Sequence, residues 1–315
     1  MILVCGEALF DVFVAAEGGT RIPAEMVVGG SPLNVAVGLA RLGATSSYFS
    51  GLSTDRFGEI LRATLANEGV DLSHVRAKDN LTTLSIVARG DDGQPRYTFY
   101  GADAADRMVT PEDLPRKLAD DVRAITMGSY TLVVKPVADA LAAFAEREGA
   151  RRVISLDPNL RPTVIGDVSR WPAQFDRFAR HATIVKASDE DIEIAFGGAL
   201  SIAEAAARWH GLGAQLVVVT RGRDGALGFP AGGDTVEVPG RRVAVVDTVG
   251  AGDTFHAAML AELDRRGRLT RDGVATLDSE ALGEVLRYAV TASSITCTRR
   301  GADLPRAAEV AAALA

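Results

Sequence analysis

Short apolar runs alternate with segments of helical periodicity from about residue 120 onward. The run Leu216–Val219 is apolar at successive positions, as expected of a strand that is buried on both faces. Between such runs, apolar residues recur about every three to four positions, which predicts helices. The predicted strands are 123–127, 153–156, 183–185, 216–220 and 243–246, and the predicted helices are 137–147, 171–179, 189–196 and 202–210. This alternation predicts an α/β fold with a parallel sheet covered by helices.

Two segments break the alternation. Residues 82–102 predict two strands joined by the turn-forming stretch Gly90–Pro95, and residues 12–28 hold β-prone stretches around Gly18 and Gly19. Neither segment is accompanied by a helix that would cover it. Together they predict a small sheet that projects as a lid from a single domain of residues 1–315, and lids over clefts sequester substrates. A peripheral hairpin is the alternative.

Composition restricts the class of protein. Apolar residues make up 47% and charged residues 24% of the 315 residues, which is typical of a globular protein and excludes a disordered chain. The net charge of −7 argues against a nucleic-acid partner. No uncharged apolar run approaches the roughly 20 residues that span a bilayer. The start of the chain lacks a basic segment and carries Glu7 and Asp11, so we expect a first strand there, no membrane partner and a cytoplasmic protein.

Several well-known sites are absent from the sequence. None of the four lysines lies in a GxxxxGK[ST] loop, and the four histidines form neither an HExxH nor an HRD motif. The two cysteines, Cys5 and Cys297, lie almost a full chain apart, which excludes a CxxC site and a disulfide framework.

Residues 243–260, VAVVDTVGAGDTFHAAML, carry the strongest chemical signal. The predicted strand 243–246 leads to a turn of Gly250, Ala251 and Gly252, and an apolar helix then begins at Asp253. The first amides of a helix have no partner within the helix and carry partial positive charge, so this turn can form an anion hole without a lysine. A carboxylate beside such a hole can accept a proton during phosphoryl transfer. A capping aspartate after a tight turn is the alternative for Asp253. The third glycine of a dinucleotide fingerprint is missing, because Phe255 stands there.

A second motif, GGSPLNVAVGLARLG, covers residues 29–43. Ser31 can cap this helix, Pro32 suits its first position and Gly43 can end it. Asn34 is then a polar residue in an apolar first turn and needs a partner, for which a sugar hydroxyl and a backbone carbonyl are equal candidates.

Two further polar positions follow predicted strands. Asp11 can accept hydrogen bonds from a pair of sugar hydroxyls, or can cap a turn. Arg161, in DPNLR at residues 157–161, lies at the carboxyl edge of the sheet, where α/β proteins place ligands. It is a candidate contact for a phosphate or the acceptor, and a solvated loop arginine is the alternative.

The two motifs together resemble the signatures of the PfkB (ribokinase-like) carbohydrate kinases, and the resemblance extends from GEALFD near the start to TRRGAD near the end. Within this family the chain is most similar to the bacterial fructokinases. The resemblance implies a Rossmann-like three-layer sandwich with a mostly parallel sheet and a β-sheet lid, ATP as phosphoryl donor, Mg²⁺, and a sugar acceptor. It also implies that Asp253 is the catalytic base and that Gly250, Ala251 and Gly252 form the anion hole.

The same resemblance assigns the remaining candidates. It places Asp11, Gly30, Ser31, Asn34 and Asn159 against the sugar, and Arg161 beside the reacting groups. Tyr97 and Phe99 of the lid can stack on the sugar or simply pack the lid. Ser188, Thr220, Gly222, Gly225 and Thr248 match nucleotide positions. Asp191 matches an indirect Mg²⁺ position, although Ser188 and Asp191 depart from the usual Asn and Glu of the NxxE segment and also fit an acidic helix start. Backbone carbonyls at Asp247, Val249 and Gly301 are candidate K⁺ ligands.

The resemblance favours D-fructose as the acceptor. Ketodeoxygluconate kinases resemble the chain too, but they commonly carry an arginine directly after the aromatic pair of the lid, where this chain has Gly101. The expected activity is therefore transfer of the γ-phosphoryl group of ATP to a primary hydroxyl of fructose. The alternatives are ketodeoxygluconate, then ribose or a nucleoside, and outside enzymes a sugar sensor on a kinase scaffold. An exposed lid edge also predicts a possible homodimer.

Overall fold

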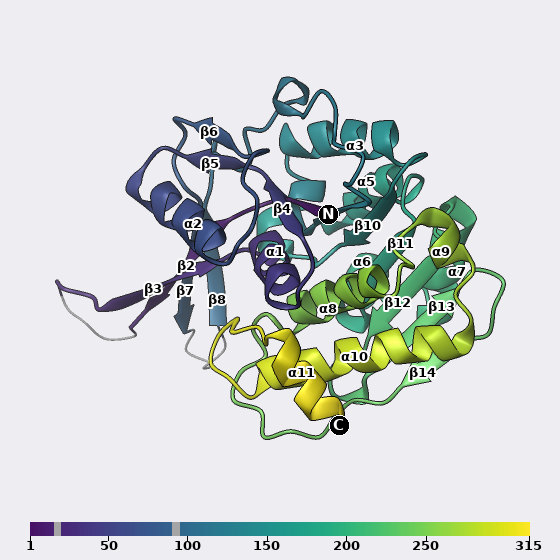
Figure 1. Cartoon of the computed structure of the whole chain (residues 1–315). Coiled ribbons are helices and arrows are strands. Elements are labelled where there is room, and N and C mark those ends of the chain that lie inside the picture. The colour runs from purple at the N-terminus through teal and green to yellow at the C-terminus, as the bar shows by residue number, and fades with distance from the viewer. Residues whose placement is uncertain (16–19, 90–94) are drawn as a thin grey trace.

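The computed structural model describes residues 1–15, 20–89 and 95–315. A large eight-stranded sheet has the order β14-β13-β12-β11-β10-β9-β1-β4, and its first six strands along the chain are parallel (Figure 1). Two antiparallel strands complete one edge. Its strands are β1 (Ile2–Cys5), β4 (Ser46–Phe49), β9 (Ala124–Gly128), β10 (Val153–Asp157), β11 (Ile184–Ser188), β12 (Leu216–Thr220), β13 (Ala226–Pro230) and β14 (Val236–Val238).

Helices cover both faces of this sheet. In β1, Ile2 and Val4 pack with residues of one group of helices, whereas Leu3 and Cys5 pack with residues of the other. Both alternating sets are apolar because both faces are buried. The first face carries α1 (Ser31–Arg41), α2 (Arg56–Asn67), α8 (Ala251–Arg265), α9 (Arg271–Ala275), α10 (Ser279–Cys297) and α11 (Ala307–Leu314), and the second carries α3 (Val137–Glu148), α5 (Trp171–Ala179), α6 (Asp189–Phe196) and α7 (Ile202–Leu212). The short α4 (Pro162–Ile165) follows β10. The predicted three-layer α/β sandwich is confirmed.

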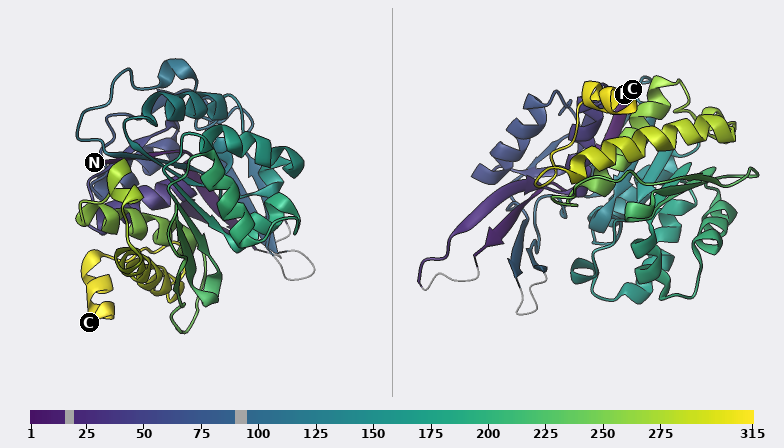
Figure 2. Two further views of the ribbon diagram at one scale, coloured as in Figure 1. Left: turned by 90° about the vertical axis from the view of Figure 1, so that its right-hand side faces the viewer. Right: turned by 90° about the horizontal axis from the view of Figure 1, so that it is seen from below.

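A four-stranded sheet of order β3-β2-β7-β8 projects from this body (Figure 2). It consists of β2 (Leu9–Val14), β3 (Ala24–Gly29), β7 (Leu84–Arg89) and β8 (Pro95–Tyr100). The two predicted segments therefore do combine into one small sheet, which begins slightly earlier, at Leu9. The predicted turn at Gly18 and Gly19, and most of that at Gly90–Pro95, lie outside the described residues. A third pair, β5 (Gly51–Ser53) and β6 (Arg76–Lys78), lies beside α2.

The helices predicted after residue 120 are confirmed at α3, α5, α6 and α7, and four of the five strands at β9 to β12. The predicted strand 243–246 is wrong. Val245 and Val246 are 62% and 64% exposed, and the Val246 amide donates to the Cys297 carbonyl at the end of α10. β-branched residues favour strands only where a neighbouring strand and a packed face are available, and β14 already ends the sheet.

Candidate active site

The turn before α8 forms a partly open set of amides. Gly250 adopts a left-handed conformation with φ of 75°, and a Cβ there would lie 2.6 Å from the Cβ of Ala302, so only glycine fits. The Thr254 amide donates to the Gly250 carbonyl, and the Ala251 amide donates to the Thr248 carbonyl. Within the described chain, the Gly252 and Asp253 amides have no backbone acceptor. Of the residues predicted to form the anion hole, Gly252 therefore keeps an open amide, whereas the Ala251 amide holds the turn, and the binding of an anion here stays a prediction.

The Asp253 carboxylate is buried at this turn and joins it to α1. Its Oδ1 accepts from the Ser31 hydroxyl at 2.6 Å, and its Oδ2 accepts from the Asn34 amide at 2.8 Å. The Asn34 amide nitrogen therefore donates to this carboxylate, which we did not predict, and a contact between Asn34 and a sugar hydroxyl stays a prediction. The prediction that Ser31 caps α1 is wrong, because Gly30 occupies the N-cap position and Ser31 is the first helical residue. The two sequence motifs meet in one hydrogen-bonded cluster.

Burial raises the pKa of Asp253 above its ordinary value. The hydrogen bonds from Ser31 and Asn34 oppose this shift, the negative charge of Asp157 adds to it, and the positive charge of Lys186 opposes it. A carboxylate that keeps two donors but has lost most of its water is a stronger proton acceptor than one on the surface. The predicted base therefore has a suitable environment.

Lys186 is a functional candidate that our reading of the sequence missed. It lies on β11, it is 3% exposed, and its Nζ donates to Asp157 Oδ2 at 2.8 Å. The same Nζ lies only 3.4 Å from the position that a Cβ on Gly252 would take. A buried cation thus lies beside Gly252 at the start of α8. The available signal was a lysine inside the apolar run TIVKAS, because lysine is almost never buried without a partner.

The small sheet places predicted sugar residues on one face. The strand register places Asp11 of β2 opposite Ser85 of β7, and Ser85 opposite Phe99 of β8, so these side chains share a face. Tyr97 lies two residues before Phe99 on β8 and therefore points to the same face. Burial raises the pKa of Asp11, and nearby Ser85 and Arg161 oppose this shift. Burial also raises the pKa of Tyr97, and the positive charge of Arg161 opposes this shift. The exposed Arg161 guanidinium therefore lies near both Asp11 and Tyr97. Asn159, just before it, has a left-handed backbone with φ of 39°.

The space beside Gly101 holds an arginine from another position. A Cβ on Gly101 would lie 2.6 Å from Nη2 of Arg107, and the Arg107 guanidinium lies 4.9 Å from the ring centre of Tyr130. Nε and Nη2 of Arg107 are buried and have no hydrogen-bond partner among the described residues. The absence of an arginine at position 101 therefore no longer argues against an acidic acceptor, because the Arg107 guanidinium occupies the space beside Gly101.

The predicted nucleotide residues line the carboxyl edge of the sheet beyond Lys186. Thr220 ends β12, Gly222 has φ of 51°, and a Cβ on Gly225 would lie 2.1 Å from the Val238 carbonyl oxygen. Ser188 and Asp191 form a capping box on α6. In that box Asp191 Oδ2 accepts from the Ser188 amide, while its Oδ1 accepts from the Leu160 amide. Both oxygens of Asp191 are thus engaged by the backbone, and its indirect role toward Mg²⁺ stays a prediction.

The Asp247 side chain links the residues that are predicted to hold a monovalent cation. Asp247 Oδ1 accepts from the Val249 amide and Oδ2 accepts from the Gly301 amide. These bonds bring the residues 247, 249 and 301 together, as the prediction requires, although the roles of their carbonyls stay a prediction. The described residues contain no group of three or more His, Cys, Asp or Glu side chains placed to hold a metal ion.

Glu7 leads to a testable pH dependence. It is buried beside Gly30, and burial raises its pKa from 4.5 to about 8, opposed by Ser129 and increased by Asp106 and Asp253. The folded state then holds a proton that the unfolded state releases between these pH values, so stability falls as pH rises from 4.5 to about 8. The slope reaches at most about 1.4 kcal/mol per pH unit. We expect thermal unfolding of Glu7→Gln to lack this part of the pH dependence, and parallel curves for the two proteins would contradict the assignment.

Comparison with known proteins identifies the class of this protein. The fold is that of a carbohydrate kinase. Residues 1–308 match the pfkB family carbohydrate kinases, and the chain belongs to this family. It is 42% identical over 282 residues to a fructokinase of Rhizobium leguminosarum bv. trifolii, covering 90% of this chain and 85% of the relative.

Two solved structures give the same picture. The fructokinase of Xylella fastidiosa with bound ATP superimposes with a TM-score of 0.89 at 27% identity, covering 99% of this chain and 97% of that one. The fructokinase of Vibrio cholerae O395 with fructose, ADP and calcium ion bound gives a TM-score of 0.82 at 27% identity, covering 100% and 98%. The predicted family, fold and phosphotransferase class are confirmed. No helix in the described ranges is long and apolar enough to cross a membrane.

Proposed function

We propose that this protein is an ATP-dependent fructokinase that transfers the γ-phosphoryl group of ATP to a primary hydroxyl of D-fructose. The observation that carries the proposal is the buried Asp253 carboxylate, which Ser31 and Asn34 hold beside the open amides of Gly252 and Asp253. The relative from Rhizobium and both solved structures are fructokinases, which supports fructose as the acceptor.

In the proposed reaction, the sugar lies between the small sheet and α1. Asp11, Gly30, Ser31, Asn34 and Asn159 contact its hydroxyls, and Tyr97 and Phe99 cover it. Asp253 accepts the proton of the attacking hydroxyl while the oxygen bonds to the γ-phosphorus and the bond to the leaving ADP breaks. The open amides of Gly252 and Asp253, with Lys186 beside them and Arg161 opposite, stabilise the negative charge on the transferred group.

The nucleotide would extend along the carboxyl edge of the sheet. Ser188, Thr220, Gly222, Gly225 and Thr248 are the proposed contacts, and the exposed Val245 and Val246 offer an apolar surface for a base. When bound, Mg²⁺ neutralises charge on the phosphates. The described side chains form no carboxylate cluster, which fits an ion that is held mainly by phosphates and water, with Asp191 acting indirectly. K⁺ at the carbonyls of Asp247, Val249 and Gly301 completes the proposed set.

A second acceptor, 2-keto-3-deoxygluconate, is favoured by Arg107 beside Gly101, because Nε and Nη2 of this guanidinium have no hydrogen-bond partner among the described residues. A sugar acid would bring a carboxylate, which pairs well with a guanidinium. Fructose carries no charge and offers no such partner to Nε and Nη2.

The experiment that separates these acceptors measures ADP release from Mg·ATP. The purified protein is tested against fructose, ketodeoxygluconate, ribose, glucose and adenosine, each with and without K⁺. The highest kcat/KM with fructose is the expected result. A preference for ketodeoxygluconate would identify Arg107 as the residue that selects the acceptor, and sugar binding without ADP release would indicate a sensor.

The small sheet is also the proposed lid and dimer contact. It exposes Phe13, Met26, Val27, Tyr97 and Tyr100, and β3 and β8 are its open edges. An ion pair between Glu25 on β3 and Arg300 after α10 joins this sheet to the nucleotide side of the protein. Exposed edges and apolar side chains favour pairing with a second copy, and we propose a cytoplasmic homodimer formed through the lid.

A further inference from the structure

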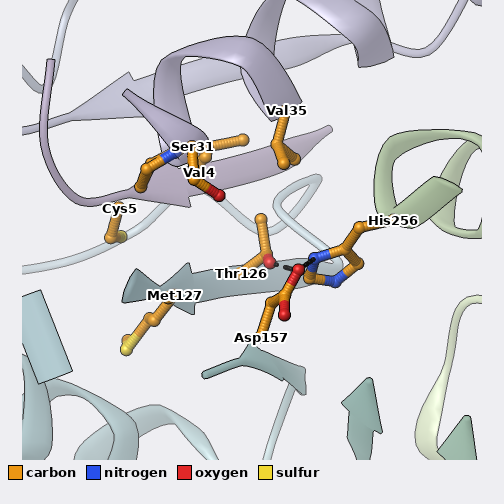
Figure 3. A pocket seen from close by; sticks show the side chains of 10 residues that line it. Val4, Cys5, Ser31, Val35, Thr126, Met127, Asp157 and His256 are labelled. Carbon is orange, nitrogen blue, oxygen red and sulfur yellow. Dashed lines mark hydrogen bonds and ion pairs between the residues drawn. The ribbon is translucent and has the colours of Figure 1, made fainter. Parts of the chain in front are cut away.

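His256 forms a buried polar cluster behind the active site. It lies on α8, three residues after Asp253, and its ring extends toward Thr126 of β9 and Asp157 of β10 (Figure 3). Its Nε2 lies 2.8 Å from the Ser155 hydroxyl and 3.5 Å from the Thr126 hydroxyl. Its Nδ1 lies 3.5 Å from Asp157 Oδ2, the atom that also accepts from Lys186. From the sequence alone, we expect only a packing role for this histidine.

Two atoms of this cluster are buried without a hydrogen-bond partner among the described residues, namely Nδ1 of His256 and Oδ1 of Asp157. Both residues line a cavity of about 10 Å³ that also touches Ser31 and Thr126 (Figure 3). A space of roughly 10–15 Å³ holds one water molecule, and a buried water needs two or more polar partners. The size of the cavity and the chemistry of its lining both fit one water molecule that bridges Nδ1 and Oδ1.

The carboxylate beside the ring favours one tautomer. Asp157 Oδ2 lies 3.5 Å from Nδ1 and can only accept, which favours the proton on Nδ1, and the Ser155 hydroxyl can then donate to Nε2. Nδ1–H makes no direct hydrogen bond to Asp157, so a bridging water would join the two groups. Asp157 in turn is held between this ring and the Lys186 ammonium.

We propose that His256 is a positioning residue. Through one water molecule in the cavity, it fixes Asp157, and Asp157 keeps the Lys186 ammonium beside Gly252. This inference rests on the proposed role of Lys186 toward the transferred phosphate. His256 touches neither the sugar nor the nucleotide in this arrangement.

A pair of matched variants tests the role. The side-chain amide of His256→Asn takes the place of Nδ1 and keeps a donor toward Asp157, whereas that of His256→Gln takes the place of Nε2 and keeps only the contact to Ser155. Removing the outer partner of a reactive group costs roughly 10- to 100-fold in metal sites. We expect kcat of His256→Gln to fall about tenfold with an unchanged KM for fructose, and His256→Asn to retain most of the wild-type kcat.

Two measurements separate this role from others. If both variants lose the same kcat, or if kcat simply follows the melting temperature, the histidine has only a structural role and the proposal fails. A high-resolution crystal structure of the wild-type protein gives a readout independent of activity. We expect one water within hydrogen-bond distance of His256 Nδ1 and Asp157 Oδ1. A cavity without water would overturn the proposed water bridge, and this result does not depend on which sugar the enzyme uses.

Discussion

Asp253→Asn is expected to lower kcat by roughly 10²- to 10⁴-fold, the range found for loss of a general base, while fructose still binds. Asparagine keeps the size of the side chain and one acceptor oxygen. The Ser31 hydroxyl can turn from donor to acceptor and pair with the new amide, so the cluster around residue 253 remains hydrogen-bonded. The measurement is kcat for ADP release together with the Kd of fructose by calorimetry.

The stability of this variant provides the first control. Burial raises the pKa of Asp253, so the folded protein bears a cost for keeping this carboxylate charged, and a neutral amide removes that cost. We therefore expect the melting temperature of Asp253→Asn to equal or exceed that of the wild type. Asp106→Asn is the matched variant, because Asp106 is also buried and also accepts two side-chain hydrogen bonds, which come from the hydroxyls of Thr83 and Tyr130. Equal losses of kcat in the two variants would rule out a special role for Asp253.

The regular part of the fold could be predicted from the sequence because its signals are local. The alternation of β11, α6, α7 and β12 follows from apolar runs and from caps such as the Ser188–Asp191 box on α6. Residues 243–246 show where that logic fails. Their β-branched residues have the propensity of a strand, but pairing depends on whether the sheet has a free position, and this is a property of the whole chain.

The site could be predicted in part for the same reason. Gly250, Gly252 and Asp253 form a contiguous motif whose chemistry follows from the start of one helix. The contact between Asp253 and Asn34 joins residues 219 positions apart, so spacing alone could not reveal it. Lys186, Asp157 and His256 lie on three separate elements, and each has an ordinary structural explanation when it is considered alone.

Lys186→Met should lower both turnover and stability. Removing one partner of a buried ion pair typically costs about 3–5 kcal/mol, because the other charge stays buried, and here the remaining charge is Asp157. The loss of a positive charge 3.4 Å from the Cβ position of Gly252 should also lower kcat by roughly 10²- to 10³-fold, as loss of one donor of an oxyanion hole does. Thermal unfolding and kcat with saturating fructose and ATP measure the two effects.

A double variant separates the two effects of Lys186. Asp157→Asn combined with Lys186→Met leaves two neutral side chains where the ion pair was, and replacement of a buried pair by neutral groups is often close to neutral for stability. We expect the melting temperature to recover toward the wild type while kcat stays low, because no ammonium remains beside the amides of Gly252 and Asp253. If kcat instead recovers together with the melting temperature, Lys186 serves only to balance the charge of Asp157. The transferred phosphate would then be stabilised by the amides and by Arg161 alone, and the positioning role of His256 would have no reactive group to act upon.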